Sequence, residues 1–258
     1  MTQPQLVLAA GGIQLPSGDV LNTTLQLGMQ NRLHNALFNI NQRAVSGTVT
    51  LAAGAYGHDR WKAGAGGCTY TFATVGNVTT LTITAGTLQQ VIEGANLESG
   101  THCLSWTGTA TARIDSGSYS TSGMTGTSVG GTNQTIEFST GTVSLPQYEA
   151  GGNASAFGYR PIGLELALCK RYGRKMTLDL LGFTLNANNL YNGTLSFDVE
   201  MRATPTLDPG ATFTVSSGSA GTVALNNATP RNATFGNSAV NWTANVGCQI
   251  TGFLNAEL

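Results

Sequence analysis

The stretch GTVSLPQYEAGGNASAFGYRPIGLELALCKRYGRK, from Gly141 to Lys175, decides how this chain is organised. It contains, in order, a segment of alternating apolar residues, a glycine-rich turn and a helical segment that a proline opens. On both sides of it charged residues are sparse, and threonine and glycine recur in short alternating runs. The stretch therefore predicts a joint between two β-rich parts of the chain.

The helical part of this stretch predicts one short helix near Leu164 to Tyr172. Pro161 suits the first turn of a helix, and Leu164 and Leu168 are four residues apart, on one face. Basic residues gather near the end, where positive charge interacts favourably with the helix dipole. About ten residues are too few for a stable isolated helix, so we expect this one to pack on the sheets.

The clearest strand signal is THCLSWTGTATARI, from Thr101 to Ile114. Apolar and polar residues alternate along it, which indicates a strand with one face on a core and one face in water. Gly108 is a natural place for a bulge or a bend. Shorter alternating segments surround Leu81, Ile136 and Val143, and turn residues separate them. Such a pattern predicts an all-β fold, an antiparallel β-sandwich of the jelly-roll type.

The composition and charge of the chain narrow the classes of partner that it is expected to bind. The chain has 258 residues, 34 of them glycine, with 10% charged residues and a formal net charge of −1. This charge gives no field that would attract nucleic acid or an anionic membrane, so neutral partners such as glycans or other proteins fit better. The start of the chain has no basic residue before Arg32, and its short apolar run breaks at Gly11 and Gly12. We therefore expect neither a signal peptide nor membrane insertion.

Cysteine and histidine spacing indicates no metal and no cofactor. Cys68, Cys103, Cys169 and Cys248 are scattered, without the close pairs of a zinc or redox motif. We expect them to be free, small hydrophobic residues, although three pairings would be possible if they were oxidised. His34, His58 and His102 lack metal-ligand spacing, and the pair His58–Asp59 is only a weak hint.

Four segments resemble a known family. The stretch ending in LPQYEAG followed by ASAFGYRPIGLELALCKRY is similar to a segment of phage tail-fibre, receptor-binding and head-spike proteins. YGHDRWKAG (Tyr56 to Gly64), LQQVIEGAN (Leu88 to Asn96) and VEMRATPTL (Val199 to Leu207) support the resemblance, which covers the chain from about residue 31 onward. It departs at Tyr148, Gly158 and Gly173.

This resemblance implies a carbohydrate-binding-module-like jelly roll on an appendage of a virion or of a phage-like particle such as a gene transfer agent. It implies four parts: an N-terminal attachment lead (residues 1–30), a jelly-roll domain (31–150), a linker with the short helix (151–175) and a small C-terminal β domain (176–258). A lead without fixed structure is the alternative for the first part. Family resemblance alone also allows a calcium ion.

We expect a long polar insert, residues 116–134, to project as a loop, and residues 33–44 to form an opening strand.

No catalytic grouping stands out. GTSVG, from Gly126 to Gly130, matches the G-x-S-x-G pattern, but no helix is predicted after it, so we interpret it as a loop coincidence. Carboxylates that could act as acid and base have no spacing that singles out a pair; they are Glu93, Glu98, Asp115, Glu137 and Glu149. Glu93 is expected to make a structural hydrogen bond to a neighbouring strand. We therefore expect that the protein is not an enzyme.

Aromatic residues give the candidate ligand contacts. Sugar rings stack on exposed aromatic side chains while nearby polar groups bind the hydroxyls. Trp61, Trp106 and Trp242 are expected in the core. Tyr56, Tyr119 and Tyr191 occur in glycine-, serine- or asparagine-rich stretches and are our candidates for ligand binding.

The sequence therefore leads to two hypotheses of function. One is a fibre or spike protein that binds a bacterial surface glycan, either capsule or lipopolysaccharide, without cutting it, and that mediates adhesion. The alternative is a purely structural fibre or connector subunit that contacts other tail or head proteins of the virion. In both, the protein is assembled in the bacterial cytoplasm, resides on the virion and forms a homo-oligomer, with a trimer expected.

Overall fold

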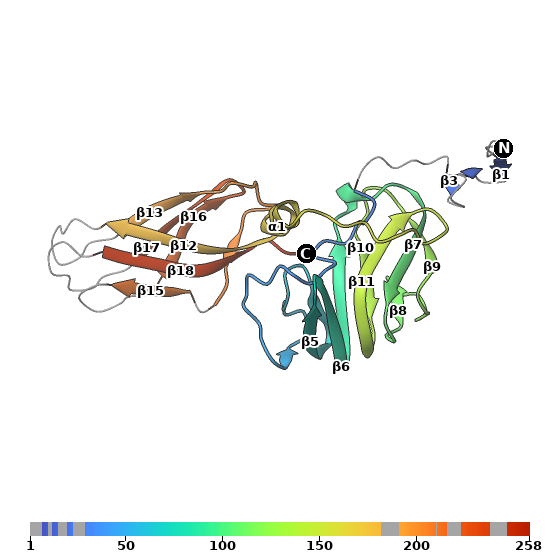
Figure 1. The fold of residues 1–258 in the computed structure, drawn as a ribbon. Coiled ribbons are helices and arrows are strands. Elements are labelled where there is room, and N and C mark those ends of the chain that lie inside the picture. The colour runs from blue at the N-terminus through green and yellow to red at the C-terminus, as the bar shows by residue number, and fades with distance from the viewer. Residues whose placement is uncertain are drawn as a thin grey trace.

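The computed structural model describes residues 7–9, 12–14, 20–22, 29–181, 191–209, 211–215, 223–237 and 247–258. It confirms an all-β fold built from antiparallel sheets. Within the described residues there is one α-helix, α1 (Ile162–Lys170), and one short 3₁₀ turn, Gly94–Asn96. Two β-rich units lie on either side of α1 (Figure 1). We call residues 29–150 the N-terminal unit and residues 173–258 the C-terminal unit.

The N-terminal unit is a sandwich whose sheet divides at one long strand, β6 (Val78–Ile92). Residues 81–83 of β6 pair with β11, whereas residues 88–92 pair with β10. We call the strands on the β11 side one arm of the sandwich and the strands on the β10 side the other arm. The two arms face each other, because the rings of Trp106 on β7 and Phe138 on β10 meet edge to face at 5.3 Å. The other strands are β4 (Val49–Leu51), β5 (Lys62–Val75), β7 (Gly100–Thr107), β8 (Ala112–Ile114), β9 (Met124–Ser128), β10 (Gln134–Phe138) and β11 (Gly141–Ala150).

Between these arms lies the larger of two hydrophobic cores. Trp61 is fully buried in it and Trp106 is 7% exposed, as predicted, while Trp242 lies outside the described residues. Leu81 and Ile83 point inward on one half of β6, and Leu88 and Ile92 on the other. The inward positions therefore change from odd to even between residues 83 and 88. A strand that passes from one arm to the other must change which of its alternating side chains face the core.

The predicted strand from Thr101 to Ile114 is in fact two strands. Its alternating residues are buried as expected, but β7 ends at Thr107 and β8 begins at Ala112. The break falls at Gly108, whose φ of 141° suits glycine and whose Cα lies too close to the Thr142 carbonyl for a side chain. Breaking the chain at Gly108 lets the two halves join opposite arms of the sandwich.

Two further predictions were wrong. The polar insert, residues 116–134, is not a loop throughout, because it contains β9, which pairs with β7. Residues 33–44 form turns rather than an opening strand. The Asn35 side chain accounts for this turn, since its amide exchanges hydrogen bonds with the main chain of Ile40 and donates another to the main-chain oxygen of Asp59.

The C-terminal unit packs two smaller sheets around a second core. One sheet consists of β12 (Gly173–Leu181), β14 (Thr206–Leu207), β15 (Thr212–Val215) and β18 (Gly247–Asn255). The other consists of β13 (Tyr191–Ser196), β16 (Val223–Thr229) and β17 (Asn232–Asn237). Met176, Phe235, Ile250 and Leu254 are among the buried residues between them. Ahead of both units, β1 (Val7–Ala9), β2 (Gly12–Gln14) and β3 (Val20–Asn22) form a small sheet; most of the predicted attachment lead lies outside the described residues.

Helix α1 forms where it was predicted, but a different face of it is buried. Leu164 is 42% exposed, whereas Glu165 and Cys169 are buried. The Glu165 carboxylate accepts hydrogen bonds from the main-chain N–H of Asn35 and, at 2.8 Å, from Arg160 Nε. The helix is thus attached to the N-terminal unit by the polar contacts of Glu165. The spacing of Leu164 and Leu168 did not indicate this face.

The cysteines whose side chains are described are free. Cys68, Cys103 and Cys169 are buried and unpaired, as predicted. Burial raises the pKa of all three thiols, so they remain protonated at neutral pH. The side chain of Cys248 lies outside the described residues.

Replacing Gly86 tests the crossing of β6 between the arms. Gly86 has a φ of 69°, and a Cβ there would lie 2.0 Å from the Gly67 carbonyl oxygen, so Gly86→Ala must move backbone. Gly76 is the matched control, with a φ of 63° and open space around the added methyl. We expect Gly76→Ala to lower the free energy of unfolding by about 1 kcal/mol and Gly86→Ala by about 3 kcal/mol or more, measured by urea denaturation. Equal losses would contradict the described packing.

Candidate functional site

The three tyrosines predicted from the sequence lie in different surroundings. Tyr56 precedes β5 and forms an isolated antiparallel bridge with Lys62, and its side chain is half-buried. Tyr119 lies in the loop after β8 and is 40% exposed. Tyr191 is the first residue of β13, so its backbone belongs to a strand rather than to a loop, and its side chain lies outside the described residues. Tyr56 and Tyr119 have different partners, described below.

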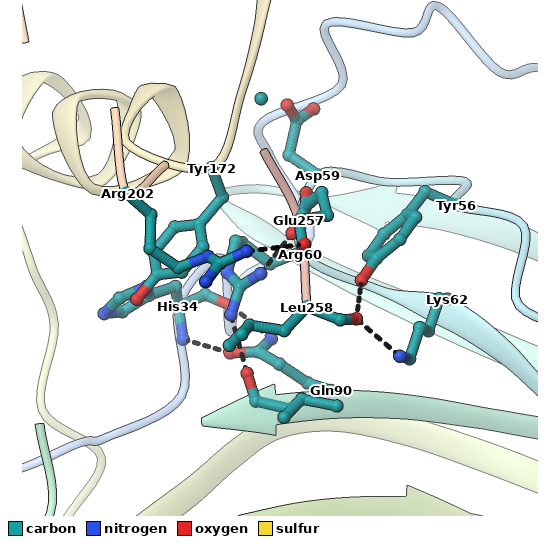
Figure 2. A network of polar contacts seen from close by, with 12 residues as sticks. His34, Tyr56, Asp59, Arg60, Lys62, Gln90, Tyr172, Arg202, Glu257 and Leu258 are labelled. Carbon is teal, nitrogen blue, oxygen red and sulfur yellow. Dashed lines mark hydrogen bonds and ion pairs between the residues drawn. The ribbon is translucent and has the colours of Figure 1, made fainter. Parts of the chain in front are cut away.

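A buried arginine occupies the centre of the interface between the two units (Figure 2). The Arg60 side chain is 1% exposed and forms an ion pair with Glu257, which is 4% exposed. It also donates a 2.6 Å hydrogen bond to the main-chain oxygen of Val91. Its guanidinium carbon lies 3.5 Å from the centre of the Tyr172 ring, a favourable position for a cation over an aromatic face. One side chain thus contacts β6, the end of α1 and the last residues of the chain.

Tyr172 fixes the other side of this cluster. Its hydroxyl donates a 2.8 Å hydrogen bond to Glu93, which also pairs with Arg171 at 3.2 Å. Burial raises the pKa of Tyr172 to about 12, so the hydroxyl is a donor at neutral pH. The Tyr172 main-chain oxygen accepts a 2.7 Å bond from the N–H of Ala256. Glu93 therefore does make a structural hydrogen bond, but to the end of α1 rather than to a neighbouring strand.

The last residues, 256–258, lie between the units and are hydrogen-bonded to both (Figure 2). Arg202 donates bonds of 2.8 and 3.0 Å to two main-chain oxygens of this segment. From the other side, Tyr56 Oη and Lys62 Nζ donate to a main-chain oxygen of Leu258 at 2.7 and 2.6 Å. Burial raises the pKa of Tyr56 and lowers that of Lys62. The Tyr56 hydroxyl is therefore engaged inside the protein.

Gln42 connects the units at the edge of the same interface. Its main-chain N–H and its side-chain amide donate to the Asp59 carboxylate at 2.6 and 2.7 Å. The same amide donates to the main-chain oxygen of Gly173 at 3.0 Å, and its oxygen accepts from the N–H of Lys175 at 3.1 Å. Burial raises the pKa of Asp59. We call the contacts of Arg60, Tyr172, Gln42, Glu257 and Leu258 the joint.

Sequence reasoning did not predict Arg60, Glu257 or Arg202 as members of the joint. One signal was nevertheless present. All four segments that carry the family resemblance contribute to the joint: 56–64, 88–96, 141–175 and 199–207 supply Arg60, the Val91 oxygen, Tyr172 and Arg202 respectively. The sequence singled out these four segments, but that they meet at one interface, and which side chains pair there, is seen only in the structure.

Polar side chains form a row across the outer face of the N-terminal unit. In β-pairing register, Lys62 on β5 is opposite Gln89 on β6, Gln89 is opposite Glu137 on β10, and Glu137 is opposite Arg113 on β8. Their neighbours along the strands, such as Leu88 and Phe138, point into the core. We call Lys62, Gln89, Glu137 and Arg113 the polar row. All four point away from the apolar core because side chains alternate along strands, but Glu137 is only 6% exposed because Tyr119 and Arg113 cover it.

Tyr119 borders the polar row at its Arg113 end. Its hydroxyl donates a hydrogen bond to Glu137, and Arg113 lies over its ring at 4.9 Å from the centre. Arg113 also pairs with Glu137 at 2.9 Å. Burial, followed by the hydrogen bond to Glu137, raises the pKa of Tyr119 to about 12. Tyr119 is thus an exposed aromatic ring held in place by a charged pair.

The serine of the GTSVG pattern and the histidine next to Asp59 lie inside the protein and are hydrogen-bonded there. The serine of GTSVG, Ser128, is 2% exposed at the end of β9 and donates to Gln134 at 2.7 Å, so it is not displayed on a turn. His58 bonds Tyr70 Oη through Nδ1 at 2.9 Å. No group of three or more histidine, cysteine or acidic residues among those described is arranged to hold a metal ion. None of the described helices is long and apolar enough to span a membrane.

Comparison with known proteins gave no relatives. A scan against protein-family models, a search of curated proteins and a search of solved structures found no match to this chain.

Breaking the Arg60–Glu257 pair tests the joint. Glu257→Gln leaves a buried guanidinium without its counter-charge, and we expect the free energy of unfolding to fall by about 3–5 kcal/mol. Glu200→Gln is the control, because Glu200 pairs with Arg231 at 3.2 Å on the surface, where the side chains are 53% and 77% exposed. The control should cost less than about 1 kcal/mol. Similar losses in urea denaturation of the two variants would contradict a buried joint.

His58 provides a test by pH. Burial lowers its pKa from 6.5 to about 4, so below pH 6.5 the unfolded chain binds a proton that the folded site resists. Stability is therefore fully present above pH 6.5 and falls as the pH decreases to about 4, by up to about 3 kcal/mol. Other groups contribute to the total pH dependence, so the measured quantity is the difference between wild type and His58→Gln. A difference that stays constant from pH 7 to pH 4 would show that His58 is not buried as described.

Proposed function

We propose that this chain is a fibre or spike subunit of a virion or phage-like particle, and that it binds a bacterial surface polysaccharide, either capsule or lipopolysaccharide, without cutting it. The observation that carries the proposal is Tyr119, a 40% exposed ring beside a row of hydrogen-bonding side chains on a sheet. The four segments similar to phage fibre and spike proteins support it from the sequence.

The chemistry of this face suits a sugar. A pyranose offers an apolar C–H face for stacking and a rim of hydroxyls that both donate and accept hydrogen bonds. Tyr119 offers the ring, Gln89 offers an amide that does both, and the partly exposed Arg113 offers a donor, which the buried Glu137 holds in place. Side chains fixed on strands bind with less loss of conformational entropy than side chains on a free loop.

Assembly supplies the strength of adhesion. One stacked sugar contributes on the order of 1 kcal/mol by analogy with aromatic pairs, so a single protomer binds weakly. A homotrimer, and many trimers on one particle, convert weak contacts into firm attachment to a cell. In this proposal the protein resides on the virion, attached to tail or head proteins, after assembly in the bacterial cytoplasm.

The joint favours a second candidate function, that of a purely structural connector. Its buried ion pair and hydrogen bonds hold the two units together, which suits a subunit that transmits force between other virion proteins. In this case the outer face would contact protein rather than glycan, and the chain would attach to no bacterial cell on its own.

Tyr119→Ala tests the adhesion proposal. Removing the ring should reduce attachment of the multivalent protein to encapsulated host cells at least about fivefold, because each lost contact is repeated in every copy. Tyr159→Ala is the matched control: Tyr159 is 56% exposed but lies in the stretch before α1, away from the polar row, and its loss should change attachment little.

Two readouts complete this test. Cells stripped of capsule or lipopolysaccharide should lose attachment of the wild type, and no new oligosaccharide ends should appear in the medium. Attachment that is equal for wild type and Tyr119→Ala, or released sugar ends, would overturn the proposal, whereas absence of attachment in every condition would leave the connector function.

A further inference from the structure

We infer that the polar row is an extended subsite for a linear run of uncharged sugar units, laid across the strands from Tyr119 toward Tyr56, rather than a pocket for one terminal sugar. This inference rests on the proposed function and names the class of ligand that the same face would take. Its basis is the alignment of four polar residues on four different strands.

The register of the sheet sets the geometry of this subsite. Lys62, Gln89, Glu137 and Arg113 occupy successive paired positions on β5, β6, β10 and β8. Neighbouring strands lie about 4.8 Å apart, so the row extends about 14 Å across the sheet. That length accommodates several linked sugar rings. A single ring would contact only one or two members of the row.

Both ends of the row are marked by a tyrosine. At the Arg113 end, Tyr119 bonds Glu137 and carries the Arg113 guanidinium over its ring. At the Lys62 end, Tyr56 forms a bridge with Lys62, and both side chains bond the main-chain oxygen of Leu258. The two candidate tyrosines are far apart in the sequence but lie on one line across the sheet. Tyr56 also contacts the joint, because its hydroxyl bonds Leu258.

Beside the row, Gly64 leaves space that the Thr87 side chain fills. Gly64 follows Lys62 and Ala63 on β5, and a Cβ at Gly64 would lie 2.0 Å from Thr87 Oγ1 and 3.5 Å from Glu137 Oε2. A pair of hydroxyls lies beside the row, where Thr111 Oγ1 and Ser139 Oγ share a 2.8 Å hydrogen bond. The amide of Gln89, the guanidinium of Arg113 and these hydroxyls together match the mixed donors and acceptors of a sugar chain, while the buried Glu137 orients Arg113 and Tyr119.

The charges of the row favour an uncharged sugar. Arg113 is paired with Glu137, and Lys62 donates to Leu258, so the cations already have partners inside the chain. An acidic sugar would have to compete with Glu137 for Arg113. A neutral sugar binds the remaining donors and acceptors without disrupting this pair, and its binding should therefore be nearly independent of salt.

The test uses the full-length protein and fragments of graded length. An array of purified bacterial polysaccharides first identifies a polymer that binds, and calorimetry then compares its mono-, di-, tri- and longer oligosaccharides at 50 and 500 mM NaCl. We expect affinity to rise about tenfold or more from one ring to three and then to level off, with little change between the two salt concentrations.

A variant in the middle of the row separates the possible outcomes. Gln89→Ala should weaken binding of the longer fragments at least about threefold while leaving the shortest fragment unchanged, and Tyr159→Ala should change neither. A monosaccharide that binds as well as the long fragments, or binding of acidic polymers alone that disappears at high salt, would overturn this inference and leave the proposed adhesion standing. Failure of every polymer to bind would overturn both.

Discussion

The structure depends on burying one permanently charged side chain, Arg60, between two β-rich units. A guanidinium stays ionised in proteins, and removing it from water is unfavourable unless its charge and its N–H groups find partners. Here the partners come from distant parts of the chain: Glu257 supplies the counter-charge, Val91 an acceptor and Tyr172 an aromatic face. Val91 belongs to the same unit as Arg60, whereas Glu257 belongs to the C-terminal unit, so the counter-charge is in place only when the two units are docked. The buried charge therefore contributes specificity of arrangement as much as stability.

The docking of the two units also fixes one end of the polar row on the outer face of the N-terminal unit. Lys62 and Tyr56 belong both to the joint and to the end of the polar row, because they bond Leu258 while Lys62 remains in register with Gln89. The position of the last residues thus defines one wall of the proposed glycan subsite. Tyr119, at the other end, depends on Glu137 and Arg113, which are fixed on β10 and β8. In the proposed function, the joint would hold the polar row in a fixed position relative to the C-terminal unit.

Local patterns predicted much of the fold and less of the site. Alternating residues identified the strands around Leu81, Ile136 and Val143 and the core residue Trp106, because burial of every second side chain leaves a periodic pattern in the sequence. Trp61 was expected in the core without such a pattern. A bend was expected at Gly108, but the complete break there depends on the close approach of the Thr142 carbonyl, which the sequence does not show. The turn around Asn35 was not predicted, because the hydrogen bonds of its side chain to Ile40 and Asp59 leave no periodic pattern in the sequence. The row of Lys62, Gln89, Glu137 and Arg113 depends on the register of four strands, which no local pattern encodes. Tyr119 was proposed from its place in a glycine- and serine-rich loop, and its role in binding stays a prediction, whereas nothing in the sequence indicated that Arg60 is buried.

The claim that the joint makes one rigid body of the two units is tested most directly by residual dipolar couplings of backbone amides in weakly aligned solution. Couplings from residues 29–150 and from the described parts of residues 173–258 are fitted separately to the structure. A rigid joint predicts the same alignment tensor, in size and orientation, for both units. Two different tensors, or a much smaller one for the C-terminal unit, would show that the units move independently and would contradict the role given to Arg60.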